Sequence, residues 1–158
     1  MAGLVRRAVL AGVVGALAAC SVAEVPARRA EPERSSTAPT VGSPELHRLA
    51  ARFADKYEVP RELVHRVIMR ESHYNPAARN GPYWGLMQIH PQTARTMGFR
   101  GEPSELLDAE TNLRYAVRYL RGAWIVSDGN MDRAVMWYAR GYYYEARDRG
   151  LLEVTGLR

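Results

Sequence analysis

The sequence predicts a small all-α domain, and three observations support this fold class. Apolar residues recur at intervals of three and four positions through the chain after residue 43, which is the period of helices buried on one face. Alternating β patterns of any length are missing. The 158 residues are 47% hydrophobic, which is enough material for one core plus appendages. We therefore expect one helical domain over residues 43–158.

The first two helices are marked by their ends. Ser43 is expected to cap the first helix, with Pro44 at its first position. The second helix is expected from about Pro60, and Asn75-Pro76 should end it because the residue before a proline is pushed out of the α region. The apolar stripes of these helices are Leu46, Leu49, Ala50, Phe53, Ala54 and Tyr57, and then Leu63, Val64, Val67 and Ile68.

Three more helices are expected after a loop through residues 80–82. A short one begins at Pro91 and stops at Gly98. Asp108 has a side chain that can cap a long helix, and the last helix begins near Met131. The stripes of the last two helices are Leu113, Ala116, Val117, Leu120 and Trp124, and then Val135, Tyr138, Ala139 and Tyr142.

The stripe of the second helix ends on an acid. Glu71 follows Val67 and Ile68 at helical spacing, so it shares the face that should be buried. Burial and the negative end of the helix dipole both disfavour its charged form and should raise its pKa. A glutamic acid that stays protonated near neutral pH can donate a proton to a leaving oxygen. The alternative is an ordinary ion pair with an arginine such as Arg70 or Arg79.

The N-terminus has the layout of an export signal. A short positive segment precedes an apolar run at residues 8–19, which ends at Cys20, the only cysteine of the chain. This run is too short to span a bilayer, which needs about twenty residues. Residues 1–19 are therefore predicted to be a signal peptide. Residues 20–42 lack hydrophobic periodicity and are predicted to be a disordered tether.

The end of the apolar run, Leu17-Ala18-Ala19-Cys20, resembles the lipobox of bacterial lipoproteins. The resemblance implies a lipid anchor on Cys20, and Ser21 after it resembles the pattern of sorting to the outer membrane. The implied location is the periplasmic face of the bacterial outer membrane. Two alternatives stay open, namely an ordinary A-x-A cleavage after Ala18 and a lone cysteine that is only a small buried hydrophobe.

Charge and composition indicate which classes of molecule the protein can bind. The net charge of +5 falls to about +3 once the two arginines of the signal are removed, which suits an anionic polymer or a membrane face. No dense basic run or interleaved aromatic platform favours nucleic acid. The four histidines show no metal-ligand spacing such as H-E-x-x-H, so we expect neither a metal nor a cofactor.

Two motifs follow each other at a specific spacing. The first begins with Glu71-Ser72, and the second runs from Gly85 to Ile89. Together they resemble the soluble lytic transglycosylase family of lysozyme-like enzymes, which cleave the glycan strands of peptidoglycan; the resemblance covers residues 46–144. It is carried by Glu71, Ser72, Tyr74, Pro76, Gly85, Leu86, Met87, Gln88, Ile89, Pro91, Thr93, Ala94, Leu106, Asp108, Asn112, Tyr119 and Leu120.

The resemblance implies a transglycosylase domain over residues 43–158 in which Glu71 is the single general acid and base. Most glycosidases use two carboxylates, but the matched motifs contain one. Glu71 would protonate the oxygen between N-acetylmuramic acid and N-acetylglucosamine, while the neighbouring N-acetyl group stabilises the positive charge. Glu71 would then accept the proton of the sugar's own 6-hydroxyl, which leaves a 1,6-anhydro end.

Five further residues are candidates for substrate contact. Gln88 matches a glutamine that hydrogen-bonds substrate, and Tyr138 matches a tyrosine whose hydroxyl leans toward the acid. Asn80 lies near the place of an absent serine that touches the N-acetyl sugar, and His90 stands where a methionine is usual. Met87 is the methionine of the Gly-Leu-Met-Gln motif. On spacing alone, Gln88 is an exposed polar residue and Tyr138 is a half-buried core aromatic. Glycine at the start of the second motif is expected to serve close backbone packing.

The late segment departs from the family pattern. Residues 137–141 read Trp-Tyr-Ala-Arg-Gly where the pattern is Ala-Tyr-Asn-Ala-Gly, so an asparagine is lost and Arg140 is new. Three tyrosines follow, and we expect Tyr142 to be packed inside and either Tyr143 or Tyr144 to face the cleft.

Three functions remain open on the sequence. The first is a peptidoglycan lytic transglycosylase tethered by a lipid. The second is a hydrolase of the goose-lysozyme type, in which water attacks instead of the 6-hydroxyl. The third is a non-catalytic glycan-binding lipoprotein that keeps the fold.

Overall fold

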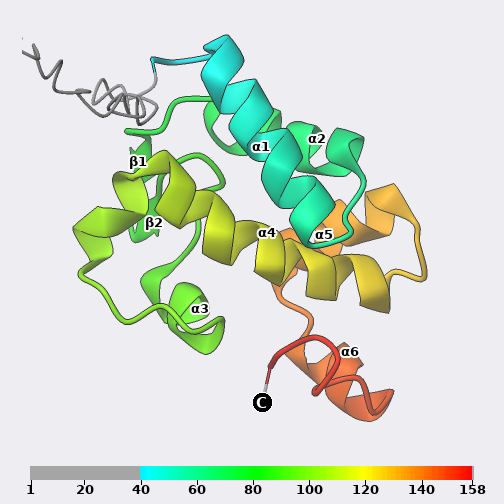
Figure 1. Ribbon diagram of the computed structural model, residues 1–158. Coiled ribbons are helices and arrows are strands. Elements are labelled where there is room, and N and C mark those ends of the chain that lie inside the picture. Colours follow the sequence, from blue (N-terminus) through cyan, green and yellow to red (C-terminus); the bar gives the residue numbers. More distant parts are fainter. Residues whose placement is uncertain (1–39, 158) are drawn as a thin grey trace, which may run out of the picture. The chain divides into compact units, whose positions relative to one another are not determined.

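The computed structural model describes residues 40–157, and its helices confirm the prediction of an all-α domain (Figure 1). The predicted signal peptide, Cys20 and most of the predicted tether lie outside the described residues. None of the described helices is long and apolar enough to cross a membrane. The elements are α1 Pro44–Lys56, α2 Arg61–Ser72, β1 Arg79–Asn80, β2 Tyr83–Trp84, α3 Pro91–Thr96, the 3-10 helix η1 Pro103–Leu107, α4 Ala109–Val126, α5 Met131–Arg140 and α6 Tyr143–Asp148.

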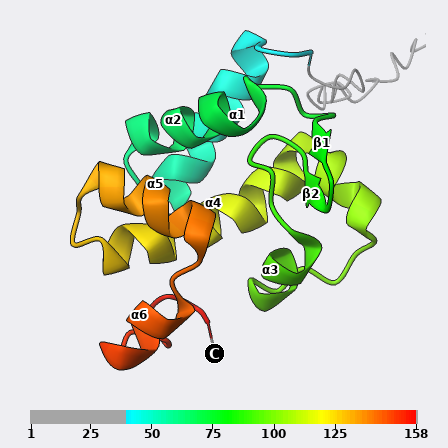
Figure 2. The same cartoon turned by 180° about the vertical axis from the view of Figure 1, so that it is seen from behind.

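Helix α4 is the central element of the domain. It packs against α1, α3, α5 and η1, and Figures 1 and 2 show it running between the α1 and α2 pair on one side and the hairpin with α3 on the other. Its N-terminus is capped as predicted, because the Asp108 carboxylate accepts a hydrogen bond from the backbone N–H of Thr111 at 2.8 Å. Trp124 is only partly buried. The other residues of the predicted α4 stripe are fully buried, namely Leu113, Ala116, Val117 and Leu120.

The first two helices differ in how well their ends were predicted. Ser43 caps α1 by accepting a hydrogen bond from the backbone N–H of Leu46 at 3.3 Å, and Pro44 occupies the first turn, as expected. Helix α2 stops at Ser72, ahead of the predicted Asn75-Pro76 break. His73 and the residue after it have φ values of 51° and 62°, so two left-handed residues end the helix before the proline can act.

A small hairpin replaces the loop predicted through residues 80–82. Strands β1 and β2 pair antiparallel, with Arg79 opposite Trp84. The guanidinium carbon of Arg79 lies 3.6 Å from the centre of a Trp84 ring, which is cation–π geometry. Two-residue strands are too short to produce the alternation by which strands are recognised in a sequence.

The last predicted helix is divided in two. Helix α5 ends before Gly141, whose φ of 83° lies in the left-handed region, and Ala139 is exposed although it was predicted to be on the buried stripe. Tyr142 is 1% exposed, which confirms its predicted place in the core. Its hydroxyl donates a hydrogen bond to Tyr119 O at 2.8 Å and occupies space that a side chain at Gly122 would fill.

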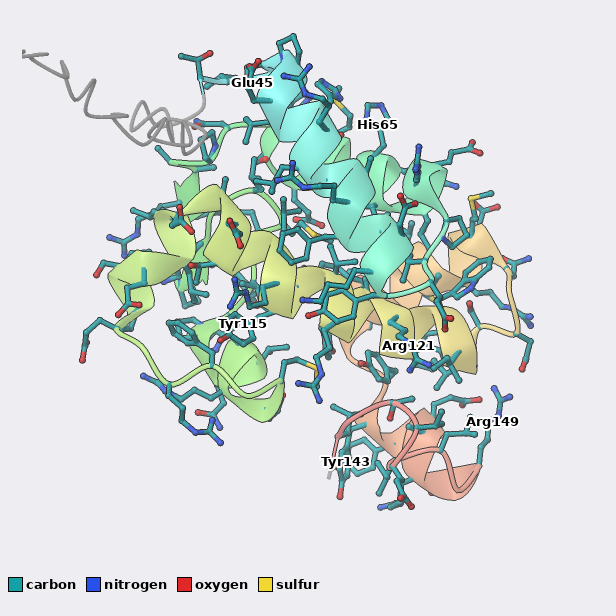
Figure 3. The ribbon with its side chains drawn as sticks, in the orientation of Figure 1. Glu45, His65, Tyr115, Arg121, Tyr143 and Arg149 are labelled. Atoms are coloured by element: carbon teal, nitrogen blue, oxygen red, sulfur yellow. The ribbon has the colours of Figure 1, made fainter. Side chains whose placement is uncertain are left out.

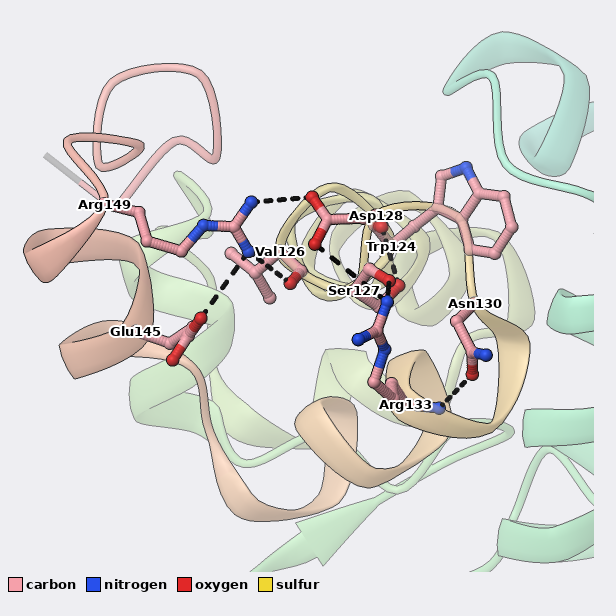
Figure 4. Close-up of polar contacts among 8 residues, drawn as sticks. All are labelled: Trp124, Val126, Ser127, Asp128, Asn130, Arg133, Glu145 and Arg149. Atoms are coloured by element: carbon pink, nitrogen blue, oxygen red, sulfur yellow. Dashed lines mark hydrogen bonds and ion pairs between the residues drawn. The ribbon is translucent and has the colours of Figure 1, made fainter.

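Helix α6 is held to the turn between α4 and α5 by polar contacts (Figure 4). Arg149 donates to Asp128 at 2.6 Å and to the backbone oxygen of Val126 at 2.7 Å. From α5, Arg133 donates to Ser127 O at 2.6 Å. Figure 3 shows Tyr143 and Arg149 together on this C-terminal part, below α4.

Candidate active site

The second motif forms a tight turn that is pinned to α4 by Asn112. Asn112 is fully buried, and its side-chain oxygen accepts a hydrogen bond from Met87 N at 3.0 Å. Its amide nitrogen donates to Trp84 O at 2.8 Å and to Leu106 O at 2.9 Å. Both donor hydrogens and the acceptor of this amide are therefore used, so one side chain on α4 holds three backbone groups, two of the turn and one of η1.

Gly85 begins this turn because only glycine fits there. Its φ is +71°, and a Cβ at this position would overlap Leu106 O and the side chain of Asn112. Its backbone N–H donates to Ala78 O at 2.8 Å, which ties the turn to the loop after α2. The predicted role of Gly85 in close backbone packing is confirmed.

The two sequence motifs meet through Ser72. Its hydroxyl lies 2.7 Å from Leu86 O, in donor geometry, so the last residue of α2 is joined to the turn that carries Gln88. The contact joins the serine after the acid to the Gly-Leu-Met-Gln turn. It also fixes the position of the end of α2, where Glu71 stands.

Glu71 is largely withdrawn from solvent at the end of α2. Its side chain is 22% exposed, and burial raises its pKa while the positive charge of Arg70 opposes the rise. The direction of the predicted shift is therefore confirmed. The Arg70 Nε lies 3.6 Å from a Glu71 oxygen, which is longer than a charge-assisted hydrogen bond of about 2.7–2.9 Å. The alternative partner, Arg79, instead stacks on Trp84.

Tyr138 lies near Glu71 but bonds elsewhere. It is 9% exposed, and its hydroxyl donates to Met87 O at 2.9 Å, whereas the predicted orientation was toward the acid. Burial raises the pKa of Tyr138 well above its usual value, and the negative charge of Glu71 raises it further. Tyr138 therefore keeps its proton beside the acid and holds the turn from the α5 side.

Gln88 is buried rather than exposed, and its amide has a fixed orientation. The side-chain nitrogen donates to Gly85 O at 2.8 Å and to Ala78 O at 3.0 Å. Both N–H groups are thereby used, and the side-chain oxygen remains as the acceptor. No buried side-chain oxygen or nitrogen in the described part lacks a partner, so this oxygen is open to solvent or to a ligand.

A groove of about 240 Å³ borders these residues. It is smaller than the roughly 300–1,000 Å³ of sites that enclose a drug-sized ligand, so it would hold one part of a polymer. Glu71 is not in its lining, but Tyr138, which lies near the acid, is. The groove is lined by Tyr83, Gln88, Ile89, His90, Thr93, Tyr119, Tyr138, Ala139, Arg140 and Gly141.

The other predicted contact residues have different positions. His90 lines the groove, caps α3 by accepting from Gln92 N at 3.0 Å, and packs edge-on against Tyr83. The prediction that Met87 contacts substrate is wrong, because its side chain is fully buried and offers a substrate no surface. Asn80 is exposed on the hairpin, outside the groove lining.

The sequence did not identify Tyr119 as a groove residue. It lies on α4, and its ring packs edge-on against that of Tyr138 with centres 5.5 Å apart. Its place in the matched pattern was the only available signal. Tyr143 and Tyr144 are exposed, but neither lines the groove, so the tyrosine expected to face it is not found there. Across residues 40–157, no three His, Cys, Asp or Glu side chains are grouped to hold a metal ion.

Comparisons with known proteins relate the sequence to a family and to one curated protein. Residues 48–150 match a family model described as the transglycosylase SLT domain. A similar curated protein is the membrane-bound lytic murein transglycosylase E of Buchnera aphidicola subsp. Acyrthosiphon pisum (strain APS), which is 36% identical over 80 residues. The match covers 46% of this chain and 36% of that protein's length. A search of solved structures gave no match.

Proposed function

We propose, since this chain belongs to the transglycosylase SLT domain family, that it is a lytic transglycosylase acting on the glycan strands of peptidoglycan. The family match includes Glu71, the turn with Gln88, and Tyr138. The observation that carries the proposal is the half-buried Glu71 with a raised pKa, held by Ser72 beside the turn that borders the groove.

Glu71 is the proton donor and then the proton acceptor of the proposed reaction. The protonated carboxyl gives its proton to the glycosidic oxygen between N-acetylmuramic acid and N-acetylglucosamine as that bond breaks. The N-acetyl group of the muramic acid stabilises the positive charge at the anomeric carbon. The 6-hydroxyl oxygen of the same sugar then bonds to this carbon and returns its proton to Glu71, so no water is consumed.

Gln88 and Tyr138 position the substrate and the turn in this scheme. The free side-chain oxygen of Gln88 accepts a hydrogen bond from a hydroxyl or N-acetyl N–H of the sugar. Tyr138 stays neutral and keeps Met87 O in place, so it acts on Gln88 through the backbone. Burial that raises the pKa of Glu71 supports its role as an acid, because it favours the protonated form that donates.

The proposed enzyme is anchored by a lipid on Cys20 at the periplasmic face of the outer membrane. This part of the proposal is supported by the sequence alone, through the lipobox-like residues 17–20 and Ser21 after them. Fractionation of cells tests it, because the wild-type protein should remain with membranes while Cys20→Ser should be released to the soluble fraction. Equal partition of the two proteins would contradict the anchor and leave the catalytic proposal intact.

Product analysis on purified sacculi tests the chemistry. The wild-type protein should release fragments with 1,6-anhydro ends, each lighter by one water than a hydrolysis product. Glu71→Gln keeps the size of the side chain and should release none. Glu62→Gln is the matched control, since Glu62 is an exposed acid of the same helix. Reducing ends would indicate a hydrolase, and equal release by Glu71→Gln would exclude the proposed acid.

A further inference from the structure

Arg140 places a full positive charge on the wall of an otherwise uncharged groove. The other lining side chains are tyrosines, apolar groups, a glutamine, a threonine and a histidine. Arg140 is exposed at the C-terminal end of α5, two residues after Tyr138. The groove therefore has a built-in preference for a negatively charged group.

This guanidinium has no carboxylate partner among residues 40–157. Its only recorded contact there is Nη1 to the sulfur of Met136 at 4.0 Å, which is weak. Several other exposed arginines are paired with carboxylates; for example, Arg66 lies against Asp132 and Arg149 against Asp128. Arg140 is thus free to form the forked, two-bond contact that suits a carboxylate.

Arg140 lies in the same groove lining as residues assigned to the proposed reaction. Tyr138 lines the same groove and lies near Glu71, so the groove and the acid are neighbours across this residue. Tyr83 is 46% exposed and packs edge-on against His90, which gives the groove a flat aromatic side. A sugar ring can stack there while a charged substituent reaches Arg140.

We infer that Arg140 binds a carboxylate carried by the muramic acid of the strand, an inference that rests on the proposed function. The sugars of the strand are otherwise neutral, so its carboxylates are the groups this cation can recognise. They have two sources. A strand stripped of its peptides carries the lactyl carboxylate of muramic acid, and an intact strand carries the carboxylates of the stem peptide.

The inference is tested by binding to three soluble strand preparations. The first retains stem peptides, the second has been stripped by an amidase so that its lactyl carboxylates are free, and the third is the stripped strand with these carboxylates converted to neutral methyl amides. Affinity is measured by calorimetry in a Glu71→Gln background, so that the strands are not consumed. Arg140→Gln is compared with Arg48→Gln, which removes the same charge from the exposed surface of α1.

Arg140→Gln should weaken binding about tenfold on a carboxylate-bearing strand, because one charge-assisted contact at an exposed wall is lost. Loss on the stripped strand assigns the lactyl carboxylate, and loss on the peptide-bearing strand assigns the stem. Arg140→Lys should recover part of the affinity. Equal affinities of Arg140→Gln and Arg48→Gln on both charged strands, or the same loss on the neutral strand, would overturn the inference.

The outcome is distinguishable from failure of the proposed function. Cleavage of sacculi by the protein with Glu71 intact is measured separately from these affinities. Carboxylate binding that depends on Arg140, with no anhydro product from the wild type, contradicts only the catalytic proposal. Anhydro products together with affinities that ignore Arg140 contradict only the assignment of this residue.

Discussion

Replacing Asn112 by alanine should loosen the whole turn that carries Gln88. Asn112→Ala removes three hydrogen bonds, two of them buried, and leaves Met87 N and Leu106 O without their partner, whereas Trp84 O keeps its bond from Ile89 N. Each buried polar group left unpaired costs about 1–3 kcal/mol. A water that enters the space left by the amide can satisfy part of this need, since such waters typically make two to four hydrogen bonds.

The expected loss from Asn112→Ala is therefore about 3–4 kcal/mol. A domain of this size has a free energy of unfolding of roughly 5–15 kcal/mol, so the variant should still fold but with a much lower urea midpoint. Urea unfolding followed by circular dichroism measures this, with an unchanged slope expected. At a temperature where the variant is folded, cleavage of sacculi should also fall because Gln88 is no longer held.

Asn130→Ala is the matched control for this prediction. Asn130 caps α5 at the surface, where its side chain accepts one hydrogen bond from Arg133 N at 2.9 Å, and loss of such a cap costs about 1 kcal/mol. A loss for Asn112→Ala no larger than that for Asn130→Ala would refute the claim that one buried amide holds the turn in place.

Three further predictions concern the same part of the molecule. Gly85→Ala should cost about 2–4 kcal/mol in urea unfolding, because a Cβ there is strained by the positive φ and overlaps Leu106 O; a cost below 1 kcal/mol would contradict the close approach. Tyr138→Phe should cost about 1–2 kcal/mol, since Met87 O loses its buried donor, and the same cost for Tyr144→Phe, whose side chain is exposed, would argue against that contact. Glu71→Gln should be more stable than the wild type at pH 7. The pKa of Glu71 is raised in the folded wild type, so the wild type loses stability as the pH rises through that pKa. The advantage of the variant should therefore vanish below about pH 4.5. An advantage that persists in acid would contradict burial of Glu71 as the cause.

The helix starts could be predicted from the sequence because their signals are local. Ser43 and Asp108 cap their helices through their own side chains, as the positions of a serine before a proline and an aspartate before a periodic stripe suggested. The end of α2 was misplaced because His73 adopts a left-handed conformation without being glycine. Gly141 did carry a stop signal, but the apolar spacing continued past it to Tyr142 and hid the break.

The site was predicted in part because motifs name residues without saying which way each one faces. Gln88 and His90 border the groove, whereas Met87, which directly precedes Gln88, points into the core. These residues belong to a tight turn whose direction is set by Asn112, a contact 25 residues away along the chain from Met87. No local pattern contains that information, so the facing of each side chain required the tertiary structure.

The placement of Glu71 shows how the domain limits the cost of a buried acid. An ionised glutamate in the middle of the α2 stripe would be fully desolvated, and the stripe residues before it, such as Val67 and Ile68, are at most 1% exposed. At the last turn the side chain keeps 22% of its surface, and Arg70 offers a positive charge that is close but not bonded. Arg70 opposes the rise in pKa that burial causes, and in the proposed reaction a group that gives a proton and then takes one back needs both states to be accessible.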